Sequence, residues 1–277
     1  MDPKPRTVKS YALFGSPVNH SLSPMIHLEF AKQFDLPISY ERILTPKGEL
    51  KTALQAFKER GGLGANITVP LKLEAYQLCD EYFPMAKQAK AVNTLLWEEN
   101  ALWGDNTDGE GLVRDLTVNL GIDLANKRIL ILGAGGAAQG ILLPLLGLGA
   151  KIVIVNRTLI KAQALAELAP DLKAYSYETL QQSDLPPFDY VINATSASLQ
   201  EALPLLSATW IKGTIAIDLA YRLQQETIFM HWAKANGALA AYDGVGMLVE
   251  QAALSFKRWH NLMPATQKLI ETLRQKS

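Results

Sequence analysis

A short apolar segment that runs directly into a glycine-rich turn constrains this chain more than any other feature. Residues 128–132 are Arg-Ile-Leu-Ile-Leu, and residues 133–138 are Gly-Ala-Gly-Gly-Ala-Ala. Gly133 permits a tight turn, Gly135 lets the backbone approach a pyrophosphate, and Ala138 takes the close-packing position of a G-x-G-x-x-G/A pattern. The helix that such a turn opens directs its N-terminus at the anion. The pattern therefore predicts a dinucleotide site.

The residues that follow the second apolar strand indicate which dinucleotide is bound. The strand at 151–155 ends in Asn156, Arg157 and Thr158. Sites for NAD usually carry an acidic residue there for the ribose 2′-hydroxyl, whereas Arg157 is a planar cation that suits a 2′-phosphate. A glycine turn can also serve packing alone, and Arg157 alone could be a solvated cation. The order strand, turn, helix (137–148) and strand favours a phosphate site, so we predict NADP.

Composition restricts the class of protein and its partners. The chain has 277 residues, of which 48% are hydrophobic and 19% are charged, enough for two hydrophobic cores. Lys plus Arg and Asp plus Glu both total 27, so no basic surplus favours nucleic acid or an anionic membrane. Cys79 is the single cysteine, which excludes an intramolecular disulfide and a multi-cysteine metal site. The oligomeric state, monomer or homodimer, is left open.

Nothing in the sequence predicts export or membrane insertion. Residues 1–6 lack the apolar core of a signal peptide, and no run reaches the roughly 18 apolar residues of a membrane span. We therefore expect a cytoplasmic protein that acts on a small molecule, with no metal, no nucleic acid and no membrane partner.

Strand-like and helix-like segments alternate after residue 128. The strands are expected at 129–132, 152–155, 189–192, 215–219 and 238–241, with helices at 137–148, 160–168 and 226–235. Such alternation is typical of a parallel, doubly wound sheet, so a Rossmann-type domain is predicted here.

The first hundred residues show the same alternation without a nucleotide loop. Strands are expected at 11–14, 39–44, 65–69 and 93–97, with helices at 25–34, 50–58 and 71–78. The glycine cluster at 61–64 precedes a strand, and we interpret it as a turn. Pro70 suits the first position of a helix, which would place Lys72 in its first turn. A second α/β domain is predicted.

Two helices are expected to connect these domains. One covers 108–120 and is stopped by Gly121, and the other covers 246–260 and packs back on the first domain. The fold class is therefore α/β with two α/β domains. We predict a substrate-binding catalytic domain at 1–105 completed by C-terminal helices at 244–277, a dinucleotide-binding domain at 106–243, and a ligand site in the cleft between them.

Polar residues gather at strand ends of the first domain and complete a set of motifs. The set comprises His20-Ser21-Leu22-Ser23-Pro24, Asn66-Ile67-Thr68-Val69-Pro70-Leu71-Lys72, Ala91-Val92-Asn93-Thr94, Asn106-Thr107-Asp108-Gly109, the Gly133 loop, Asn156-Arg157-Thr158, Asn193-Ala194-Thr195 and Gly244-Val245-Gly246-Met247-Leu248-Val249-Glu250-Gln251. In this order, and over nearly the whole chain, these segments closely resemble the shikimate dehydrogenase family.

The resemblance implies reversible, NADP-linked hydride transfer between 3-dehydroshikimate and shikimate, a step of chorismate and aromatic amino acid biosynthesis. Lys72 and Asp108 match the catalytic pair. The substrate-binding residues implied are Ser21 and Ser23 for the carboxylate, supported by Thr68 and Tyr221, and Asn66, Asn93, Asp108 and Gln251, with Lys72, for the hydroxyl end. The expected cofactor-binding residues are Gly133, Ala134, Gly135, Gly136, Ala137, Asn156, Arg157, Thr158, Lys161, Thr195, Leu219, Gly244 and Met247.

Ketone reduction requires such residue types independently of the resemblance. The cofactor supplies a hydride, and a protein group must protonate the developing alkoxide or polarise the carbonyl. Lys72 with a carboxylate partner suffices. The positive end of its helix favours loss of the lysine proton, whereas Asp108 opposes this, so the resting protonation of Lys72 is left open.

Each candidate also has a purely structural interpretation. Lys72 alone could be a solvated helix lysine, and Asp108 could belong to a helix cap that Asn106 or Thr107 also serves. The two serines could cap the helix near Met25. Asn66, Thr68 and Asn93 could be ordinary turn or edge-strand residues, and Tyr221 a packed aromatic; His20 and His27 are assigned no catalytic role.

Some positions depart from the family pattern. Leu28 stands where the family usually has Asn, Gln139 where it has Arg, Leu223 where it has Pro and Glu226 where it has Thr, and the glycine expected near Ser198 is missing. The sequence leaves two alternative functions: a quinate/shikimate dehydrogenase that prefers NAD, and a dinucleotide-binding sensor or assembly module without turnover.

Overall fold

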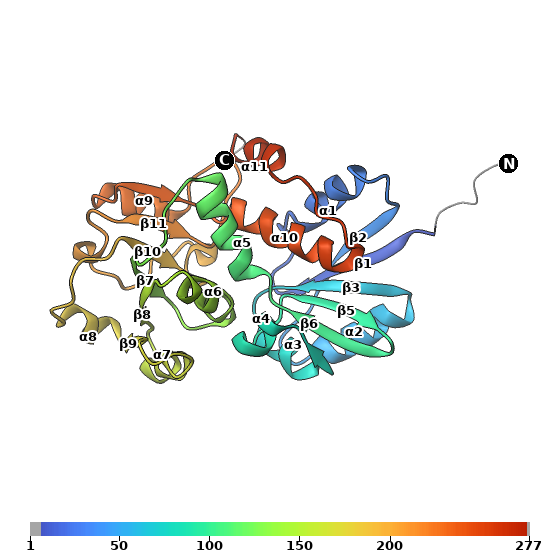
Figure 1. The fold of residues 1–277 in the computed structure, drawn as a ribbon, viewed down its shortest axis with the longest axis horizontal. Helices are drawn as coiled ribbons and strands as arrows, with labels where there is room; N and C mark the ends of the chain where they lie inside the picture. The colour runs from blue at the N-terminus through green and yellow to red at the C-terminus, as the bar shows by residue number, and fades with distance from the viewer. Residues whose placement is uncertain (1–6, 276–277) are drawn as a thin grey trace. The chain divides into compact units, whose positions relative to one another are not determined.

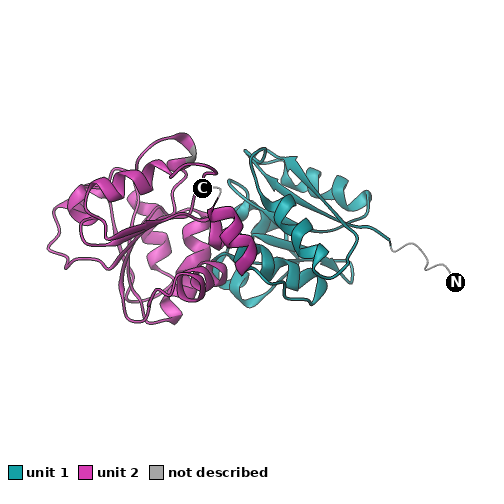
Figure 2. Cartoon of the chain, turned by 90° about the horizontal axis from the view of Figure 1, so that it is seen from above, with its two compact units in different colours: residues 1–108, 249–266 teal, residues 109–248, 267–277 magenta. Residues whose placement is uncertain are grey.

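The computed structural model describes residues 7–275 and consists of two compact units (Figures 1 and 2). Unit 1 contains the chain up to Asp108 together with Val249–Thr266, and unit 2 contains Gly109–Leu248 together with the chain from Gln267 onward. Of the segment expected from residue 244 onward to complete the first domain, Val249–Thr266 belong to unit 1, and 244–248 and 267–275 belong to unit 2. Residues 1–6, expected to lack an export signal, lie outside the described residues. No helix within 7–275 has the length and apolar character that crossing a membrane requires.

Unit 2 contains the predicted doubly wound sheet. Its six strands are all parallel, in the order β12-β11-β10-β7-β8-β9. The elements are β7 (Arg128–Leu132), α6 (Gly136–Gly147), β8 (Lys151–Val155), α7 (Leu159–Ala166), β9 (Lys173–Tyr175), α8 (Tyr177–Gln181), β10 (Tyr190–Asn193), β11 (Ile215–Asp218), α9 (Ile228–Ala235) and β12 (Ala240–Tyr242). The five predicted strands are confirmed within two residues, while β9 and α8 were not predicted.

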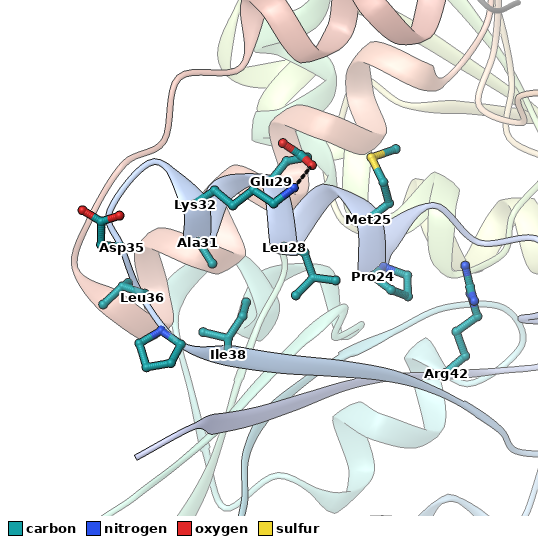
Figure 3. Close-up of a pocket in the computed structure, with 11 residues that line it drawn as sticks. Pro24, Met25, Leu28, Glu29, Ala31, Lys32, Asp35, Leu36, Ile38 and Arg42 are labelled. Atoms are coloured by element: carbon teal, nitrogen blue, oxygen red, sulfur yellow. Dashed lines mark hydrogen bonds and ion pairs between the residues drawn. The ribbon is translucent and has the colours of Figure 1, made fainter. Parts of the chain in front are cut away.

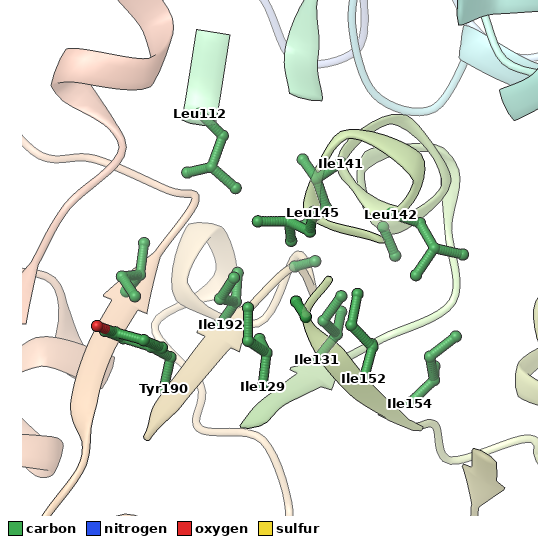
Figure 4. Packing of buried hydrophobic residues seen from close by; sticks show 14 of the residues in the cluster. Leu112, Ile129, Ile131, Ile141, Leu142, Leu145, Ile152, Ile154, Tyr190 and Ile192 are labelled. Atoms are coloured by element: carbon green, nitrogen blue, oxygen red, sulfur yellow. The ribbon is translucent and has the colours of Figure 1, made fainter. Parts of the chain in front are cut away.

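Successive residues of the central strands point to opposite faces of this sheet, and both faces are buried. Ile129 and Ile131 of β7 pack under α6 in one core cluster, which Figure 4 shows with Ile141 and Leu145 of that helix above the strands. The intervening Leu130 and Leu132 belong to the cluster on the other face, which includes Phe229 of α9. A parallel sheet buried on both faces requires apolar residues at nearly every strand position, and 128–132 meets this requirement.

Unit 1 contains a mixed sheet rather than a repeat of the parallel one. Its strand order is β2-β1-β3-β5-β6-β4, and β5 runs antiparallel to both β3 and β6. The elements are β1 (Lys9–Gly15), α1 (Ser23–Lys32), β2 (Ile38–Leu44), α2 (Leu50–Glu59), β3 (Gly62–Ile67), α3 (Lys72–Leu78), β4 (Glu81–Tyr82), α4 (Pro84–Ala89), β5 (Thr94–Glu98) and β6 (Ala101–Asp105). The short β4 and α4 and the hairpin strand β6 were not predicted.

The prediction that residues 61–64 form a turn was wrong for most of the cluster. Only Gly61 lies in the turn, with φ of +90°, and β3 begins at Gly62. Gly64 is required by packing, because a Cβ there would lie 2.6 Å from Trp259 Nε1 and 2.8 Å from the Leu95 carbonyl oxygen. Glycine in this strand therefore marks a close approach of a side chain and not a chain reversal.

The predicted helix at 108–120 changes its hydrogen-bond pattern midway. An α-helix, α5 (Asp108–Arg114), passes into a π-helical turn over Asp115–Asn119, and Gly121 ends the segment with φ of +65°, as predicted. Within unit 2 the buried Asp115 accepts hydrogen bonds at 2.9 and 3.1 Å from Arg274 of α11 (Gln267–Arg274). This ion pair joins the last helix to the rest of unit 2.

The helix α10 (Val245–His260) confirms the prediction of a helix over 246–260. The part that belongs to unit 1 packs on its sheet through Trp259, whose ring stacks on Tyr11 at 4.5 Å and whose Nε1 donates to the Leu95 carbonyl at 2.9 Å. Arg258 donates twice to Oδ2 of Asp105, at 2.8 and 2.6 Å. These contacts fix the helix against β5 and β6.

His27 of α1 is completely buried in this packing. Its ring stacks on Tyr40 at 4.6 Å and lies 5.0 Å from the Trp259 ring. Burial lowers the pKa of His27 to about 3, although the hydrogen bond to Asn66 acts in the opposite direction. The imidazole is therefore neutral at physiological pH.

We expect Leu145→Ala to lower the free energy of unfolding of unit 2 by about 2–5 kcal/mol, because it leaves a cavity between α6 and the sheet. Leu145 is fully buried, whereas Leu239 is 76% exposed. Leu239→Ala, the matched control, should change the value by less than about 0.5 kcal/mol. Urea unfolding of the three proteins measures both effects, and equal losses in the two variants would contradict the proposed core.

The neutral His27 should make stability depend on pH. The pKa of its ring is 6.5 when unperturbed and about 3 in the fold. The unfolded chain therefore binds the extra proton as pH falls below 6.5, and stability present above that value is lost at lower pH. Between pH 7 and pH 5 this loss amounts to about 2 kcal/mol for one group. Unfolding curves should show a weaker pH dependence for His27→Gln and an unchanged one for His20→Gln, which alters an exposed histidine.

Candidate active site

The two predicted catalytic side chains form a buried ion pair in unit 1. Lys72 Nζ lies 2.5 Å from Oδ2 of Asp108, and the two side chains are only 12% and 5% exposed. The helix α3 begins at Lys72 rather than at Pro70, so the predicted start was two residues early, but Lys72 does lie in the first turn. A lysine nitrogen held by a buried carboxylate does not belong to a solvated helix lysine.

Backbone hydrogen bonds bring these distant segments together. The Lys72 carbonyl accepts from the backbone N–H of Val92 at 2.9 Å, and the N–H of Asn93 donates to the Asp105 carbonyl at 3.0 Å. The β5–β6 hairpin, which pairs Thr94 with Asp105, therefore places Asn93 beside the segment that leads to Asp108. Asn106 Oδ1 accepts from the N–H of Asp108 at 3.2 Å and serves the start of α5, as anticipated.

Asn93 connects the predicted hydroxyl-binding residues. Its Nδ2 donates to Oδ1 of Asp108 at 2.8 Å and to Oε1 of Gln251 at 3.2 Å, and it also reaches the Thr107 hydroxyl at 2.9 Å. Asn93, Asp108 and Gln251 are respectively 2%, 3% and 9% exposed. These contacts bring Lys72, Asn93, Asp108 and Gln251 together, and their roles toward a substrate stay a prediction.

The amide of Asn66 is held by several protein partners. Its Oδ1 accepts from the Tyr40 hydroxyl at 2.8 Å and from His27 Nε2 at 3.0 Å. Its Nδ2 contacts the Asn93 carbonyl, the Thr94 hydroxyl and the Ser255 hydroxyl at 3.2, 3.3 and 3.0 Å. Every polar atom of the amide is engaged within unit 1, so the side chain is arranged to hold its neighbours in place.

The predicted carboxylate-binding residues lie after β1 and after β3. Ser21 donates from Oγ to the Ser23 hydroxyl at 3.1 Å, and its Oγ also accepts from the Ser23 backbone N–H at 3.2 Å. The N-cap of α1 is Leu22 and has no side-chain cap, so neither serine occupies the capping position. Thr68 is half-buried and donates its backbone N–H to the Phe14 carbonyl. Parallel pairing of β1 with β3 brings both segments to one sheet edge.

Thr94, Thr107 and Ser255 join this polar cluster although they were not predicted as site residues. Ser255 lies one helical turn after Gln251 on α10, and Thr94 directly follows Asn93. The available signal for Ser255 was its i, i+4 spacing from Gln251, a candidate substrate-binding residue, because both residues then occupy one face of the helix. Chemistry alone gave no reason to prefer these hydroxyls over any other.

The glycine loop of unit 2 has the geometry expected for a dinucleotide. Gly133 has φ of +103°, which a side chain would strain, and a Cβ at Gly135 would meet nothing within 4 Å. The N-cap of α6 is Gly135 and has no side-chain cap, so the first N–H groups of this 12-residue helix point at an open loop. Ala134, Gly136 and Ala137 complete the loop, and these features fit a pyrophosphate.

The predicted ribose-phosphate residues lie at the carboxyl end of β8. Arg157, Thr158 and Lys161 are exposed, and Asn156 donates from Nδ2 to the Thr158 carbonyl at 2.9 Å. Two cations and short polar side chains are thus presented beside the glycine loop, whose Gly133 N–H bonds the Val155 carbonyl. The donor set fits the 2′-phosphate of NADP.

The remaining predicted cofactor residues lie at the ends of β10, β11 and β12. Thr195 donates its hydroxyl to Oδ1 of Asn193 at 2.7 Å. Leu219 and Gly244 are in close contact, because a Cβ at Gly244 would lie 2.3 Å from the Leu219 carbonyl oxygen. Met247 is 7% exposed and packs in the core of unit 2. Tyr221 is half-buried and belongs to unit 2, so its role toward the substrate stays a prediction.

Asp218, a buried carboxylate at the end of β11, holds several neighbouring groups by hydrogen bonds. Asp218 accepts from the Ser198 hydroxyl at 2.6 Å, from Asn193 at 3.1 Å and from the N–H of Ala220 at 3.2 Å. Burial raises the pKa of Asp218, and these hydrogen bonds lower it in part. Ser198, where a family glycine was expected nearby, therefore fastens its loop to the end of β11.

Leu28 lines a surface groove of unit 1, where the family usually has Asn. The groove has a volume of about 910 Å³ and lies between α1 and β2, and Figure 3 shows Met25, Leu28 and Ile38 along it. None of the predicted catalytic or substrate-binding residues lines it. Among the described residues, no group of three or more His, Cys, Asp and Glu side chains is arranged to hold a metal ion.

Family models match three segments that together cover most of the chain. Residues 13–95 match the shikimate dehydrogenase substrate binding domain, residues 116–221 match shikimate/quinate 5-dehydrogenase, and residues 244–274 match the shikimate 5′-dehydrogenase C-terminal domain. A curated relative, the shikimate dehydrogenase (NADP(+)) of Alkalilimnicola ehrlichii, is 48% identical over 269 residues, which are 95% of this chain and 98% of the relative.

Solved structures show the same architecture. The Ael1 enzyme from Pseudomonas putida is 41% identical with a TM-score of 0.85, covering 96% of this chain and 98% of its own. The shikimate 5-dehydrogenase of Thermus thermophilus, solved in complex with NADP(H) and shikimate, is 35% identical with a TM-score of 0.83, covering 98% and 100%. By the family models and by identity over its whole length, this chain belongs to the shikimate dehydrogenase family.

Proposed function

We propose that this protein is an NADP-dependent shikimate dehydrogenase, which reversibly reduces 3-dehydroshikimate to shikimate in aromatic amino acid biosynthesis. The observation that carries the proposal is the buried Lys72–Asp108 pair, held together with Asn93 and Gln251. A lysine paired with a carboxylate, beside two amides that can grip hydroxyl groups, suits a polyhydroxylated ketone. Curated relatives named shikimate dehydrogenase (NADP(+)) support this substrate and cofactor.

The residues of unit 2 would hold NADP through its phosphates. The N–H groups at the start of α6 would hold the pyrophosphate, and Arg157 with Lys161 and Thr158 would hold the 2′-phosphate. When bound in its reduced form, the cofactor supplies the hydride that adds to the carbonyl carbon. The open space at Gly135 admits close approach of the backbone to the phosphates.

The proton that completes the reduction comes from the protein. Lys72 Nζ donates its proton to the carbonyl oxygen as negative charge develops there, and the lysine regains a proton from solvent before the next turnover. Asp108 orients Nζ through the 2.5 Å contact. In the oxidation of shikimate the same nitrogen accepts the hydroxyl proton.

Hydrogen bonds to its carboxylate and to its hydroxyls would orient the substrate. Ser21, Ser23 and Thr68 offer hydroxyl groups to the carboxylate, and Tyr221 is proposed to support the same end. Asn93, Asp108 and Gln251 offer amide and carboxylate groups to the substrate hydroxyls. Asn66 is proposed to act from behind these groups, because its own hydrogen-bonding capacity is filled by protein partners.

Two further functions are less well supported. A quinate/shikimate dehydrogenase that prefers NAD would carry an acidic residue at the end of β8, where Arg157 stands. A dinucleotide-binding sensor or assembly module without turnover would need only the loop in unit 2, so the lysine-carboxylate pair and both asparagines in unit 1 would have no purpose. Arg157 thus favours NADP, and the buried pair favours an enzyme.

We also propose that the enzyme acts in the cytoplasm without a nucleic-acid partner. The formal net charge is zero, so no basic surplus would hold a polyanion. The single thiol, Cys79, is free and buried, and burial raises its pKa to about 12, which keeps it unreactive.

Lys72→Ala should slow NADPH formation from shikimate, because the variant lacks the lysine that accepts the hydroxyl proton; we expect kcat to fall by at least about 100-fold. Absorbance at the reduced-nicotinamide wavelength measures this, with Lys51→Ala, on the exposed side of α2, as a control for the loss of a lysine. Undiminished turnover in Lys72→Ala would remove the assigned role. Wild-type protein that binds NADP but reduces neither NADP nor NAD would instead favour the non-catalytic module.

Arg157→Ala should raise KM for NADP by about 10-fold or more while leaving KM for NAD nearly unchanged, because only NADP carries the 2′-phosphate that this cation contacts. Steady-state kinetics with both cofactors, at saturating shikimate, give the preference directly. Lys212→Ala, another exposed cation of unit 2, serves as the control. If the ratio of the two KM values stayed the same in Arg157→Ala, the phosphate contact would be assigned to the wrong residue.

A further inference from the structure

Two hydroxyl groups lie directly behind the candidate active site and belong to none of its predicted residues. Thr94 of β5 and Ser255 of α10 are both 0% exposed, and their hydroxyl oxygens are 2.7 Å apart. Neither can touch a substrate that enters from solvent. A buried hydroxyl costs free energy unless it is hydrogen-bonded, so two such groups in contact require further partners. Ser255 contacts Thr94, and Thr94 in turn donates to Asn93.

The amide of Asn93 has two chemically different ends, and its contacts fix which end faces the ion pair. Oδ1 accepts from the backbone N–H of Thr107 at 2.9 Å and from the Thr94 hydroxyl at 2.8 Å. The opposite end, Nδ2, then donates to Oδ1 of Asp108 and to Oε1 of Gln251. A flipped amide would direct its carbonyl oxygen at the Asp108 carboxylate and its NH2 group at the Thr107 backbone N–H, so both of these bonds would be lost.

The hydroxyl contacts continue behind Thr94. Asn66 Oδ1 accepts from the Tyr40 hydroxyl and from His27, so its Nδ2 must face Ser255, to which it donates at 3.0 Å. The Ser255 hydroxyl lies 2.7 Å from the Thr94 hydroxyl and 3.0 Å from the Gln251 carbonyl, which also accepts from the Thr107 hydroxyl at 3.0 Å. Hydrogen-bond contacts thus join Asn66, Ser255, Thr94 and Asn93 in that order, and Thr94 donates to Asn93.

We propose that Thr94 and Ser255 are positioning residues of the reaction, which fix the amide orientation of Asn93 and through it the Asp108–Lys72 pair. The inference rests on the proposed function, because it assigns these hydroxyls to the same catalytic site. Asp108 then has one oxygen held by Asn93 and the other by Lys72, so Nζ stays directed at the substrate oxygen. Neutral His27, whose single N–H serves Asn66, anchors the far end of the chain of hydrogen bonds.

Substitutions at Thr94 separate positioning from packing. Thr94→Val keeps the volume and the β-branched shape but removes the hydroxyl, and we expect kcat with shikimate to fall by about 10- to 100-fold, because a displaced catalytic group costs rates of this order. KM for NADP should stay the same, since the glycine loop belongs to unit 2. Thr94→Ser removes the methyl group and keeps the hydroxyl, so its kcat should return to within about threefold of wild type.

Both variants should lose some stability, because Thr94→Ser loses a buried methyl group and Thr94→Val leaves buried polar partners unpaired, whereas only Thr94→Val should lose kcat. Thermal unfolding of both variants, beside kcat, therefore tests the proposal. Thr214→Val is the matched control: its hydroxyl is also buried and donates to the Ile211 carbonyl at 2.8 Å, but it belongs to unit 2 and takes no part in the chain of hydroxyls. It should retain wild-type kcat.

A double-mutant cycle shows whether Thr94 acts through Asn93. Thr94→Val should reduce kcat little further in an Asn93→Ala background, whereas independent effects would multiply. Wild-type kcat in Thr94→Val, equal loss in Thr94→Ser and Thr94→Val, or full multiplicativity in the cycle would each overturn the inference. Failure of the wild-type protein itself to oxidise shikimate with NADP would contradict the proposed function instead, so the two failures are distinguishable.

Discussion

The removal of Lys72 and Asp108 from water is the constraint on which the rest of unit 1 depends. A buried ion pair loses its hydration, and its mutual attraction compensates only if the remaining polar atoms are also satisfied. Asp108 meets this condition with one oxygen on Lys72 and the other on Asn93. Each partner in turn needs its own partners, so one buried charge pair accounts for the amides and hydroxyls packed behind it.

Secondary structure supplies those partners from segments far apart in the chain. The β5–β6 hairpin delivers Asn93 and the Asp105–Asp108 segment to one place, and α10 returns much later in the sequence to add Gln251 and Ser255. The Arg258–Asp105 pair and the stacking of Trp259 on Tyr11 hold that helix in register. Small residues allow the approach, as at Gly64, where a side chain would collide with Trp259.

In unit 2, the buried carboxylate of Asp218 is likewise satisfied by protein partners, but the ligand expected there is the cofactor. Its strands are buried on both faces and leave polar side chains mainly at their carboxyl ends, where the glycine loop and Arg157 lie. Asp218 is held by hydroxyl, amide and backbone donors and ties the loop of Ser198 to β11. A rigid end of the sheet is what a cofactor site needs, because ordering the loops after binding would cost affinity.

The sequence alone determined the elements whose signals are local. Alternating apolar strands and helices predicted the parallel sheet of unit 2, and the turn at Gly133 with Arg157 predicted the phosphate site, because backbone conformation and charge are properties of single positions. The resemblance to the family motifs singled out Lys72 and Asp108. The tertiary structure decided the features that depend on contacts between distant segments. It placed the start of β3 inside the glycine cluster and made β5 antiparallel. It also occupied the hydrogen-bonding atoms of the Asn66 amide with His27, Tyr40 and Ser255. Hydrogen bonds such as Thr94 to Asn93 depend on distances of a few ångströms between chain segments, and no pattern along the sequence encodes such distances.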